Sequence, residues 1–319
     1  MNVKLLLAKL FNKFRIYIIL FVLLIIAVTT SNEFGTYGNI TNLLSQMSII
    51  GILAIGQTFV LLTGNFDLSQ GSFVALGSVL IALTIPYSIA AAIGVTIVVL
   101  LLMGVFNAFF VNRGVVSFIV TLGMMGIARS VALFLADSDA IRVPNLDFKK
   151  LAYGTILDIP YSVFLWIALI VLFSIVLKHT RIGKYIYATG GNKESARLSG
   201  VNVKRVMYVV YLISAFCGAA ASAVYTSRLG TALPDKAVGY EMDSIAAAVI
   251  GGTSMFGGVG TLWQTFVGVL IYGIITNYLN LMGVSAYWQQ VVKGLMIALA
   301  VYLNYKASIK ERRSQNAKE

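Results

Sequence analysis

One short polar segment, Thr63–Ser72, separates two apolar runs and reads TGNFDLSQGS. It carries a carboxylate at Asp67 and hydrogen-bonding side chains at Ser69 and Gln70. Side chains of these types can hydrogen-bond a hydroxylated solute that passes between helices, and the glycines permit the turn. They can equally cap a helix that begins near Gly71, because an Asp or Ser oxygen accepts the unpaired N–H groups of a first turn. The sequence leaves both roles open.

A second polar segment, Tyr240–Ser244, opens another apolar run and places two acids, Glu241 and Asp243, in one helical turn. Carboxylates near a helix N-terminus interact favourably with the helix dipole, which is the simplest account of this pair. The alternative is that both acids meet a polyhydroxylated solute, or the protein that delivers it, at an external mouth. Asn107 and Thr121 are scattered polar residues that can also bond a solute, although most such residues only join helices.

Signals of enzyme chemistry are missing from the sequence. There is one histidine, His179, and no HExxH, CxxC or GxxxxGK[S/T] pattern. The one cysteine, Cys217, lies in an apolar run, where we expect it to contribute to packing. We therefore expect this chain to have no catalytic site, no metal site and no ATP site of its own.

The composition is that of a protein with many membrane-spanning helices. Of 319 residues, 59% are hydrophobic and 11% are charged, and the mean hydropathy is +0.88, which is more apolar surface than a soluble domain can bury. A net charge of +12 would suggest nucleic acid binding in a soluble protein, but here the cations gather at the ends of apolar runs. We expect their partner to be the lipid bilayer with its anionic inner leaflet, and no nucleic acid.

We predict an all-α polytopic membrane protein with about ten transmembrane helices, because each crossing needs about 20 apolar residues between polar or glycine-rich breaks. The chain, 1–319, is expected to form one transmembrane domain with halves of about 1–159 and 160–319. No cleavage site follows the first apolar run, so we expect that run to be retained. The predicted spans are 14–31, 42–63, 70–85, 88–110, 116–136, 160–178, 206–229, 241–257, 261–282 and 286–304.

Charge sets the expected orientation, with both termini on the cytoplasmic side. The predicted cytoplasmic segments then hold most of the 24 Lys and Arg residues. Two cations, Arg129 and Lys293, fall inside spans, where each needs a partner or a wet cavity. Five spans precede the span at 160–178 and its loop, so matching spans of the two halves cross the membrane in opposite senses, which allows an inverted repeat.

The strongest charge feature is a basic island at 178–205, between two long apolar spans. It contains a single acid, Glu194, and its cations are Lys178, Arg181, Lys184, Lys193, Arg197, Lys204 and Arg205. Such a loop belongs on the cytoplasmic surface, where a cytosolic partner can contact it or anionic lipid can hold it. Within it, residues 194–198 can form one helical turn that presents Arg197 and Leu198 and is bounded by glycines.

Four motifs, in this order, resemble the permease subunits of bacterial ABC importers for ribose, xylose, galactose and related sugars. They are TGNFDLSQGSFVALG at 63–77, GNKESARLSGV at 191–201, YEMDSIAAAVIGGTSMFGGVGT at 240–261 and GVSAYWQQVVKG at 283–294. The resemblance spans nearly the whole chain. It departs from the family at Phe66 and Gln70, where other members more often have an aliphatic residue and a small one.

The resemblance implies a permease that carries a monosaccharide, a ribose-like pentose or a hexose, across the bacterial cytoplasmic membrane. It also implies cytoplasmic ABC ATPase subunits that hold the ATP and Mg²⁺, an external sugar-binding protein, and a second permease copy in a homodimer or heterodimer, of which we expect the homodimer. By the same resemblance, a short coupling helix would contact the ATPase through Asn192, Glu194, Ser195, Ala196, Arg197, Leu198, Ser199 and Gly200. The residues that we expect along the solute pathway are Asp67, Ser69, Gln70, Asn107, Thr121, Glu241 and Asp243.

Three other functions are open from the sequence. A secondary transporter driven by an ion gradient would need titratable groups in the membrane, and Asp67, Glu241 and Asp243 are a small set for that task. A second alternative is an ABC permease for another small polar solute, such as a branched-chain amino acid or a nucleoside. Branched-chain amino acid permeases share a similar glycine-rich element with an Asp-Leu-Ser-like sequence, but the island and the 240–261 segment favour a sugar. A membrane scaffold without transport activity is disfavoured by the polar breaks in both halves.

Overall fold

The computed structural model describes residues 3–316, with side chains described for residues 16–302, 305 and 306. Its helices are α1 (Val3–Thr30), α2 (Tyr37–Leu62), α3 (Gln70–Thr84), α4 (Ile89–Asn112), α5 (Ser117–Leu135), α6 (Leu146–Tyr153), α7 (Tyr161–His179), α8 (Arg181–Gly191), α9 (Lys193–Leu198), α10 (Val203–Leu229), α11 (Tyr240–Ile250), α12 (Leu262–Leu281) and α13 (Ala286–Asn316). Strand β1 (Ile141–Arg142) pairs antiparallel with β4 (Thr231–Ala232), and β2 (Thr155–Ile156) with β3 (Ile159–Pro160). Basic residues near the termini that support the predicted orientation lie outside the residues whose side chains are described; they are Lys4, Lys9, Lys13, Arg15, Lys310, Arg312, Arg313 and Lys318.

Polar residues set where the long helices begin. Thr36, Ser88 and Thr261 precede α2, α4 and α12, and each side-chain oxygen accepts a backbone N–H from the first turn of its helix. At the C-terminal end of α10, Gly230 takes the left-handed conformation that commonly terminates a helix. At these four helix ends, the bounding residue thus sets where the apolar helix starts or stops.

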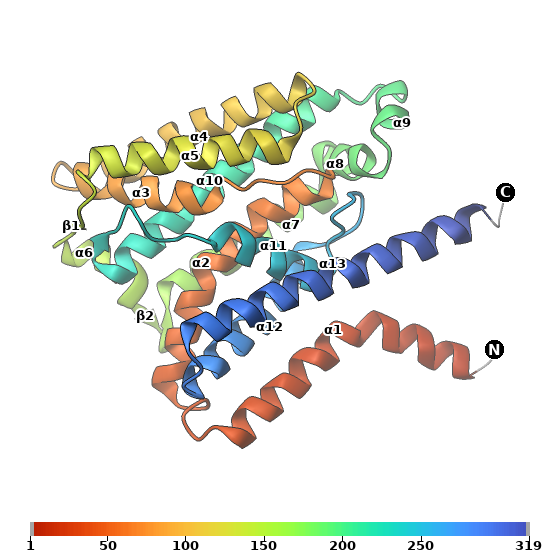
Figure 1. Cartoon of the computed structure of the whole chain (residues 1–319), viewed down its shortest axis with the longest axis horizontal. Coiled ribbons are helices and arrows are strands. Elements are labelled where there is room, and N and C mark those ends of the chain that lie inside the picture. The colour runs from red at the N-terminus through yellow and green to blue at the C-terminus, as the bar shows by residue number, and fades with distance from the viewer. Residues whose placement is uncertain (1–2, 317–319) are drawn as a thin grey trace.

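Two long helices, α2 and α10, pack against each other at the centre of the bundle. Helix α10 also contacts α3 and α4, and α2 also contacts α7, α11 and α12, so the other helices surround this pair (Figure 1). The two central helices approach closely because their contact surfaces are small: a methyl group on Gly56 of α2 would lie 2.8 Å from the Cα atom of Ser214 in α10. This contact places Ser214 in the interior of the molecule.

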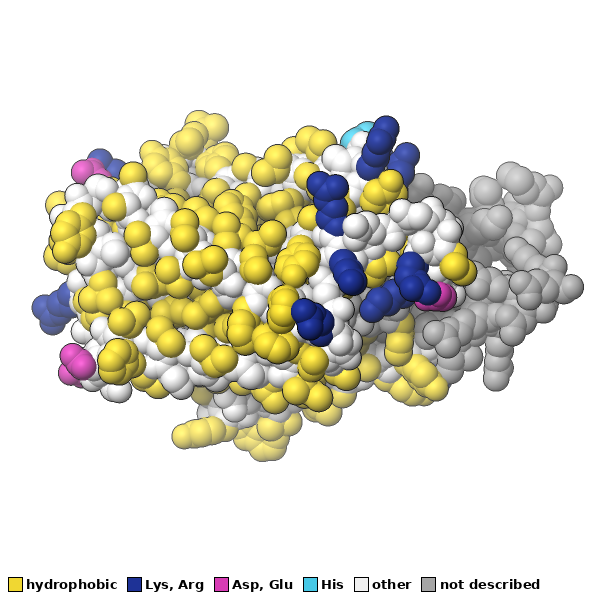
Figure 2. Space-filling view, turned by 90° about the horizontal axis from the view of Figure 1, so that it is seen from above, with side chains coloured by type: hydrophobic (Ala, Val, Ile, Leu, Met, Phe, Trp, Pro, Cys, Tyr) yellow, Lys and Arg dark blue, Asp and Glu magenta, His cyan; other side chains and the backbone are white. Residues whose placement is uncertain are grey.

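The outer helices are apolar but exposed. Leu102 of α4 and Ile119 and Phe134 of α5 have exposed fractions of 64%, 61% and 80%. On the face shown in Figure 2, apolar side chains cover the middle, and most Lys and Arg side chains gather at the end that carries α8 and α9. An apolar band with charges at its end is stable against lipid rather than water. The chain is therefore a polytopic membrane protein.

Among the residues whose side chains are described, six helices are long and apolar enough to cross a membrane: α2, α4, α5, α7, α10 and α12. Two shorter apolar helices are Ile16–Thr30, which is part of α1, and α3. The prediction of an all-α polytopic fold is confirmed, and the number of ten crossings stays a prediction.

One predicted span, 241–257, differs from the structure. It is helical only as α11, which ends at Ile250, and residues 251–261 form a glycine-rich loop. The prediction followed apolar composition, but Gly257 and Gly258 adopt φ angles of +90° and +75°, which an α-helix excludes. At about 1.5 Å per residue, α11 and α3 are about 16 and 22 Å long, which is less than the hydrocarbon thickness of about 30 Å.

Helices α3 and α11 are therefore broken elements, and both begin inside the bundle. Each follows a non-helical segment, 63–69 before α3 and 233–239 before α11. From their starting points α3 and α11 lead toward opposite ends of the molecule, with α11 pointing to the end that carries α8 (Figure 1). We call residues 63–69 the first break and residues 233–239 the second break.

Candidate functional site

The carboxylate of the first break is fully enclosed. Asp67 is 1% exposed, and its Oδ1 atom accepts hydrogen bonds from the backbone N–H (3.0 Å) and the Oγ atom of Ser69. Its Oδ2 atom accepts a hydrogen bond of 2.6 Å from the Oγ atom of Ser214 in α10. The side chain of Ser69, although it precedes α3, makes no capping bond of its own. Asp67 thus closes the turn that leads into α3, and both of its oxygens have protein partners.

Gln70, the first residue of α3, links the break to three other helices. Its Nε2 atom donates to the Oγ atom of Ser214 (2.9 Å) and to the carbonyl of Leu53 in α2 (3.1 Å). Its Oε1 atom accepts from the Oγ atom of Ser244 in α11 (2.9 Å). Both polar atoms of the Gln70 amide therefore take part in hydrogen bonds, and these bonds join α3 to α2, α10 and α11.

Asn107 of α4 completes this group. Its Nδ2 atom donates to the Oγ atom of Ser69 at 3.2 Å, and its Oδ1 atom, although buried, has no hydrogen-bond partner. We call the six residues, each at most 1% exposed, the polar cluster: Asp67, Ser69, Gln70, Asn107, Ser214 and Ser244. It brings together residues of α3, α4, α10, α11 and the first break, with hydroxyl and amide groups around a single carboxylate.

Two members of the polar cluster, Ser214 and Ser244, were missed by sequence reasoning. Ser214 stands in the apolar sequence LISAFCG, and Ser244 follows the more conspicuous pair of acids. A serine within an apolar helix is ordinarily satisfied by its own backbone. Neither serine therefore carries a local signal that marks it as a member of the polar cluster.

The acids of α11 lie on two different sides of the helix. Glu241 is 7% exposed, its Oε1 atom accepts from the backbone N–H of Gly239 at 3.1 Å, and a methyl group on Gly71 would lie 2.1 Å from its Oε2 atom. Asp243 accepts from the Nζ atom of Lys293 in α13 at 3.1 and 3.3 Å. Glu241 thus packs against the first turn of α3, and Asp243 ties α11 to α13.

The two cations predicted to need partners have them. Lys293 bonds Asp243 and lies 5.6 Å from the centre of the Tyr272 ring. Arg129 of α5 donates to the backbone carbonyls of Pro234 (2.6 Å) and Lys236 (2.5 Å). The guanidinium therefore holds the second break in place through backbone groups.

Thr121, the remaining predicted pathway residue, is buried in α5 and bonds the carbonyl of Ser117 in its own helix at 2.9 Å. It makes no hydrogen bond to the polar cluster. Its neighbour Ser117 does contact the first break, because the Ser117 Oγ atom accepts from the backbone N–H of Phe66 at 3.2 Å. The hydroxyl of Tyr211 donates to the carbonyl of the same residue at 3.1 Å. Phe66 is therefore fixed through both of its backbone polar groups.

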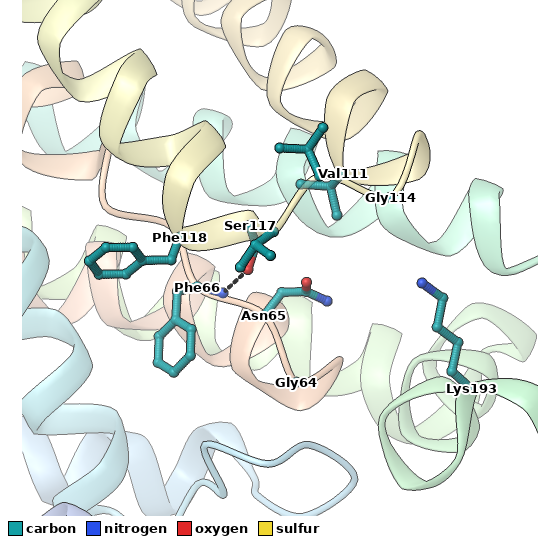
Figure 3. Close-up of a pocket in the computed structure, with 10 residues that line it drawn as sticks. Gly64, Asn65, Phe66, Val111, Gly114, Ser117, Phe118 and Lys193 are labelled. Atoms are coloured by element: carbon teal, nitrogen blue, oxygen red, sulfur yellow. Dashed lines mark hydrogen bonds between the residues drawn. The ribbon is translucent and has the colours of Figure 1, made fainter.

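A cavity of about 290 Å³ lies beside the first break, between the α4–α5 loop and α9. Asn65 and Lys193 approach it from opposite sides, and the ring of Phe66 points elsewhere (Figure 3). Its other lining residues include Gly64, Gly114 and Ser117. Phe66, the residue before the buried Asp67, also lines the cavity, so the cavity lies against the first break at its island end.

The predicted helical turn of the basic island is helix α9. The Asn192 side chain accepts the Ser195 N–H at 2.9 Å and caps it, and Gly200 follows with a φ of +83°. Ala196 is buried, and Leu198 is 79% exposed. The eight predicted coupling residues all belong to α9 and its flanks: Asn192, Glu194, Ser195, Ala196, Arg197, Leu198, Ser199 and Gly200.

Arg197 and Glu194 form an exposed ion pair of 2.7 Å on α9, and this hydrogen bond raises the pKa of Arg197 above its usual value. An exposed pair of this kind contributes little stability. Helix α9 therefore presents an apolar side chain, Leu198, next to a cationic group, Arg197, and an anionic group, Glu194. Exposed basic side chains of the island surround it (Figure 2).

Known proteins resemble the chain over most of its length. Residues 39–301 match the family described as the permease component of the branched-chain amino acid transport system. The ribose import permease protein of Haemophilus influenzae is 37% identical over 90% of this chain and 91% of its own, and that of Bacillus subtilis is 39% identical over 84% and 85%. The D-allose transport system permease protein of Escherichia coli is 36% identical over 93% of both chains. No solved structure matches.

Proposed function

The chain belongs to the family of branched-chain amino acid transport system permease components, and we propose that it is the membrane-spanning subunit of an ATP-driven importer for a monosaccharide. The observation that carries the proposal is its similarity, at 36–39% identity over more than four fifths of each chain, to permeases for ribose and D-allose. The family as a whole includes amino acid permeases, so these relatives decide between solute classes.

The chemistry of the polar cluster agrees with a sugar. Apart from Asp67, whose oxygens accept from Ser69 and Ser214, the cluster offers neutral hydroxyl and amide groups. Such groups both donate and accept, which suits the hydroxyls of a sugar. An amino acid would instead need charged groups for its ammonium and carboxylate. We propose that Gln70, Ser244 and the unpaired Oδ1 atom of Asn107 bond sugar hydroxyls when α3 and α11 part.

Energy would come from partner subunits. We propose that α9 docks on a cytoplasmic ABC ATPase through Leu198 and Arg197, and that the ATP and Mg²⁺ are bound there and not by this chain. An external sugar-binding protein would deliver the solute, and a second copy of the permease would complete a homodimer. On this proposal, both termini and the basic island lie on the cytoplasmic side of a bacterial inner membrane. An even number of crossings, such as the predicted ten, puts the two termini on the same side.

A nucleotide-driven permease needs two conformations with different access. The conformation described here has a cavity at the island end and a closed polar cluster behind it. We propose that it is an occluded state, in which the starts of α3 and α11 are bonded to each other through Gln70 and Ser244. Entry of a sugar would exchange that bond for bonds to solute.

The experiment that tests the proposal is isolation of the permease from its native membrane in mild detergent, with measurement of ATP hydrolysis. An ABC ATPase at fixed stoichiometry is expected with the natural chain and not with a variant in which Arg197→Glu and Leu198→Asp are combined. A matched control is Lys184→Glu, an exposed substitution on α8. Isolation of the natural chain with no ATPase activity, together with solute uptake driven by an ion gradient, would show that it is a secondary transporter.

A further inference from the structure

Three backbone segments meet at the island end of the molecule. Gly190, in the last turn of α8, lies so close to the end of α2 that a methyl group on it would be 1.8 Å from the carbonyl oxygen of Leu62. The same methyl group would be 2.5 Å from the backbone nitrogen of Gly258, which donates to the Leu62 carbonyl at 2.9 Å. We call the group Leu62, Gly190, Gly257 and Gly258 the glycine junction.

The junction depends on the absence of side chains. Gly257 and Gly258 adopt positive φ angles, and a methyl group on Gly257 would lie 2.6 Å from the carbonyl oxygen of Gly190. A contact with backbone atoms cannot be relieved by rotating a side chain, so a larger residue would separate the segments. Gly191, the next residue of α8, is different, because a methyl group there would meet no atom within 4 Å.

A side chain of α8 makes a second connection to the same loop. Tyr187 lies one turn before Gly191 and is half-buried, and its hydroxyl donates to the carbonyl of Gly260 at 2.7 Å. The glycine-rich loop 251–261 is therefore held to α8 at two points, the junction and Tyr187. It continues directly from α11, which ends at Ile250.

The position of the junction in the chain relates it to both broken elements. Leu62 is the last residue of α2, immediately before the first break. Gly257 and Gly258 lie in the loop after α11. Gly190 precedes α9 by only two residues, Gly191 and the N-cap Asn192. The glycine junction therefore links α8, and through it the exposed helix α9, to two segments: the end of α2 before the first break and the loop after α11.

We propose that the glycine junction is the latch that closes the solute pathway at its island end, and that Tyr187 and Gly190 are positioning residues through which α9 opens it. The proposal rests on the proposed function. When a partner moves α9, α8 moves with it, and the bonds from Tyr187 to Gly260 and from Gly258 to Leu62 break together. The loop after α11 and the end of α2 then separate, which opens the route from the polar cluster toward the cavity beside Asn65.

The test uses the complete transporter, with its ATPase, in lipid vesicles loaded with radiolabelled ribose. Efflux is measured without ATP, and ATP-driven uptake and ATP hydrolysis are measured in parallel. Gly190→Ala is expected to speed efflux about tenfold and to lower the ribose moved per ATP hydrolysed, because the methyl group forces the latch apart. Gly191→Ala, a change of the same kind one residue away, is expected to match the natural protein in both measurements.

Tyr187→Phe provides an independent reading, because it removes one hydroxyl and keeps the ring. It is expected to raise efflux about threefold and to lower ribose moved per ATP while ATP hydrolysis itself continues. A residue with only a structural role would lower assembly but would not change this ratio. If Gly190→Ala does not assemble, the Tyr187→Phe result decides.

Unchanged efflux and an unchanged ratio in Tyr187→Phe, or in an assembled Gly190→Ala variant, would overturn the latch. Equal effects of Gly190→Ala and Gly191→Ala would do the same, because they would attribute the change to helix α8 in general. Failure of the proposed function would give a different result. The natural transporter itself would then show no ATP-driven uptake of ribose or of D-allose.

Discussion

The first and second breaks perform the same structural task with different chemistry. At the first break, Asp67 accepts hydrogen bonds from the neutral hydroxyls of Ser69, within the break, and Ser214 of α10. Around the second break and the start of α11, charged groups dominate: Arg129 holds the break through its backbone carbonyls, and Asp243 of α11 pairs with Lys293 of α13. On the proposed function, we infer that the first break exchanges hydrogen-bond partners with a neutral solute, whereas the second break holds α11 in position.

The largest effect is expected from removing the carboxylate of the first break. Asp67→Ala leaves the N–H of Ser69 and the hydroxyl of Ser214 without an acceptor in the interior, which should cost about 3 kcal/mol of unfolding free energy and abolish uptake. Thermal unfolding in detergent and uptake in vesicles measure both. The exposed Asp139→Ala provides a control. A stable, active Asp67→Ala variant would show that the first break does not depend on its carboxylate.

Separating the starts of the two broken helices should have the next largest effect. A methyl group introduced by Gly71→Ala would lie 2.1 Å from the Oε2 atom of Glu241 and 2.6 Å from the carbonyl of Ala237. We expect a cost of about 2 kcal/mol and an uptake rate about tenfold lower. Gly94→Ala in α4 is the matched control, because nothing lies within 4 Å of its added carbon. Equal behaviour of the two variants would contradict the contact between α3 and α11.

The ion pair that ties α11 to α13 can be tested by a double-mutant cycle. Lys293→Met leaves Asp243 without its cation, and Asp243→Asn leaves the ammonium without its anion, so each should cost about 2 kcal/mol. In the double variant no unpaired charge remains, so its loss of stability should be about half of the sum of the two single losses. Chemical denaturation in detergent measures all three. Additive losses would mean that the pair does not stabilise the position of α11.

The smallest effect is expected at the hydrogen bond that joins the two broken helices, α3 and α11. Ser244→Ala removes the donor to Gln70 Oε1, which should cost about 1 kcal/mol of stability. If Ser244 also bonds the sugar, the KM for ribose should rise a few-fold with little change in the maximal rate. Uptake rates over a range of ribose concentrations separate the two parameters. A fall in maximal rate alone would assign Ser244 to packing.

Features that depend on local sequence could be predicted. The first break, the polytopic class and the helical turn at α9 follow from composition and glycine placement, whereas the second break lies before the 240–261 segment that the sequence singled out. Whether α11 continued to residue 257 could not be decided in this way, because the loop after Ile250 is as apolar and small as a packed helix. Its end depends on backbone angles that only the contacts of the loop determine.

The partners in the polar cluster could not be predicted, because they are far apart in the chain. Ser214 is 147 residues from Asp67, and Ser244 is 174 residues from Gln70. Nothing local distinguishes these serines from others in apolar runs. The same holds for Tyr187, whose role depends on a carbonyl 73 residues away. Polar residues in membrane helices acquire a role through packing, which a single sequence does not reveal.

The most direct test of the central claim is uptake of radiolabelled ribose and D-allose into vesicles that contain the permease, its ATPase and its sugar-binding protein. The account predicts accumulation that requires ATP, persists when an ionophore collapses the ion gradients, and disappears when Arg197→Glu and Leu198→Asp are combined in α9. Uptake that needs no ATP and stops with the ionophore would contradict it, and would point to Asp67, Glu241 and Asp243 as ion-binding groups.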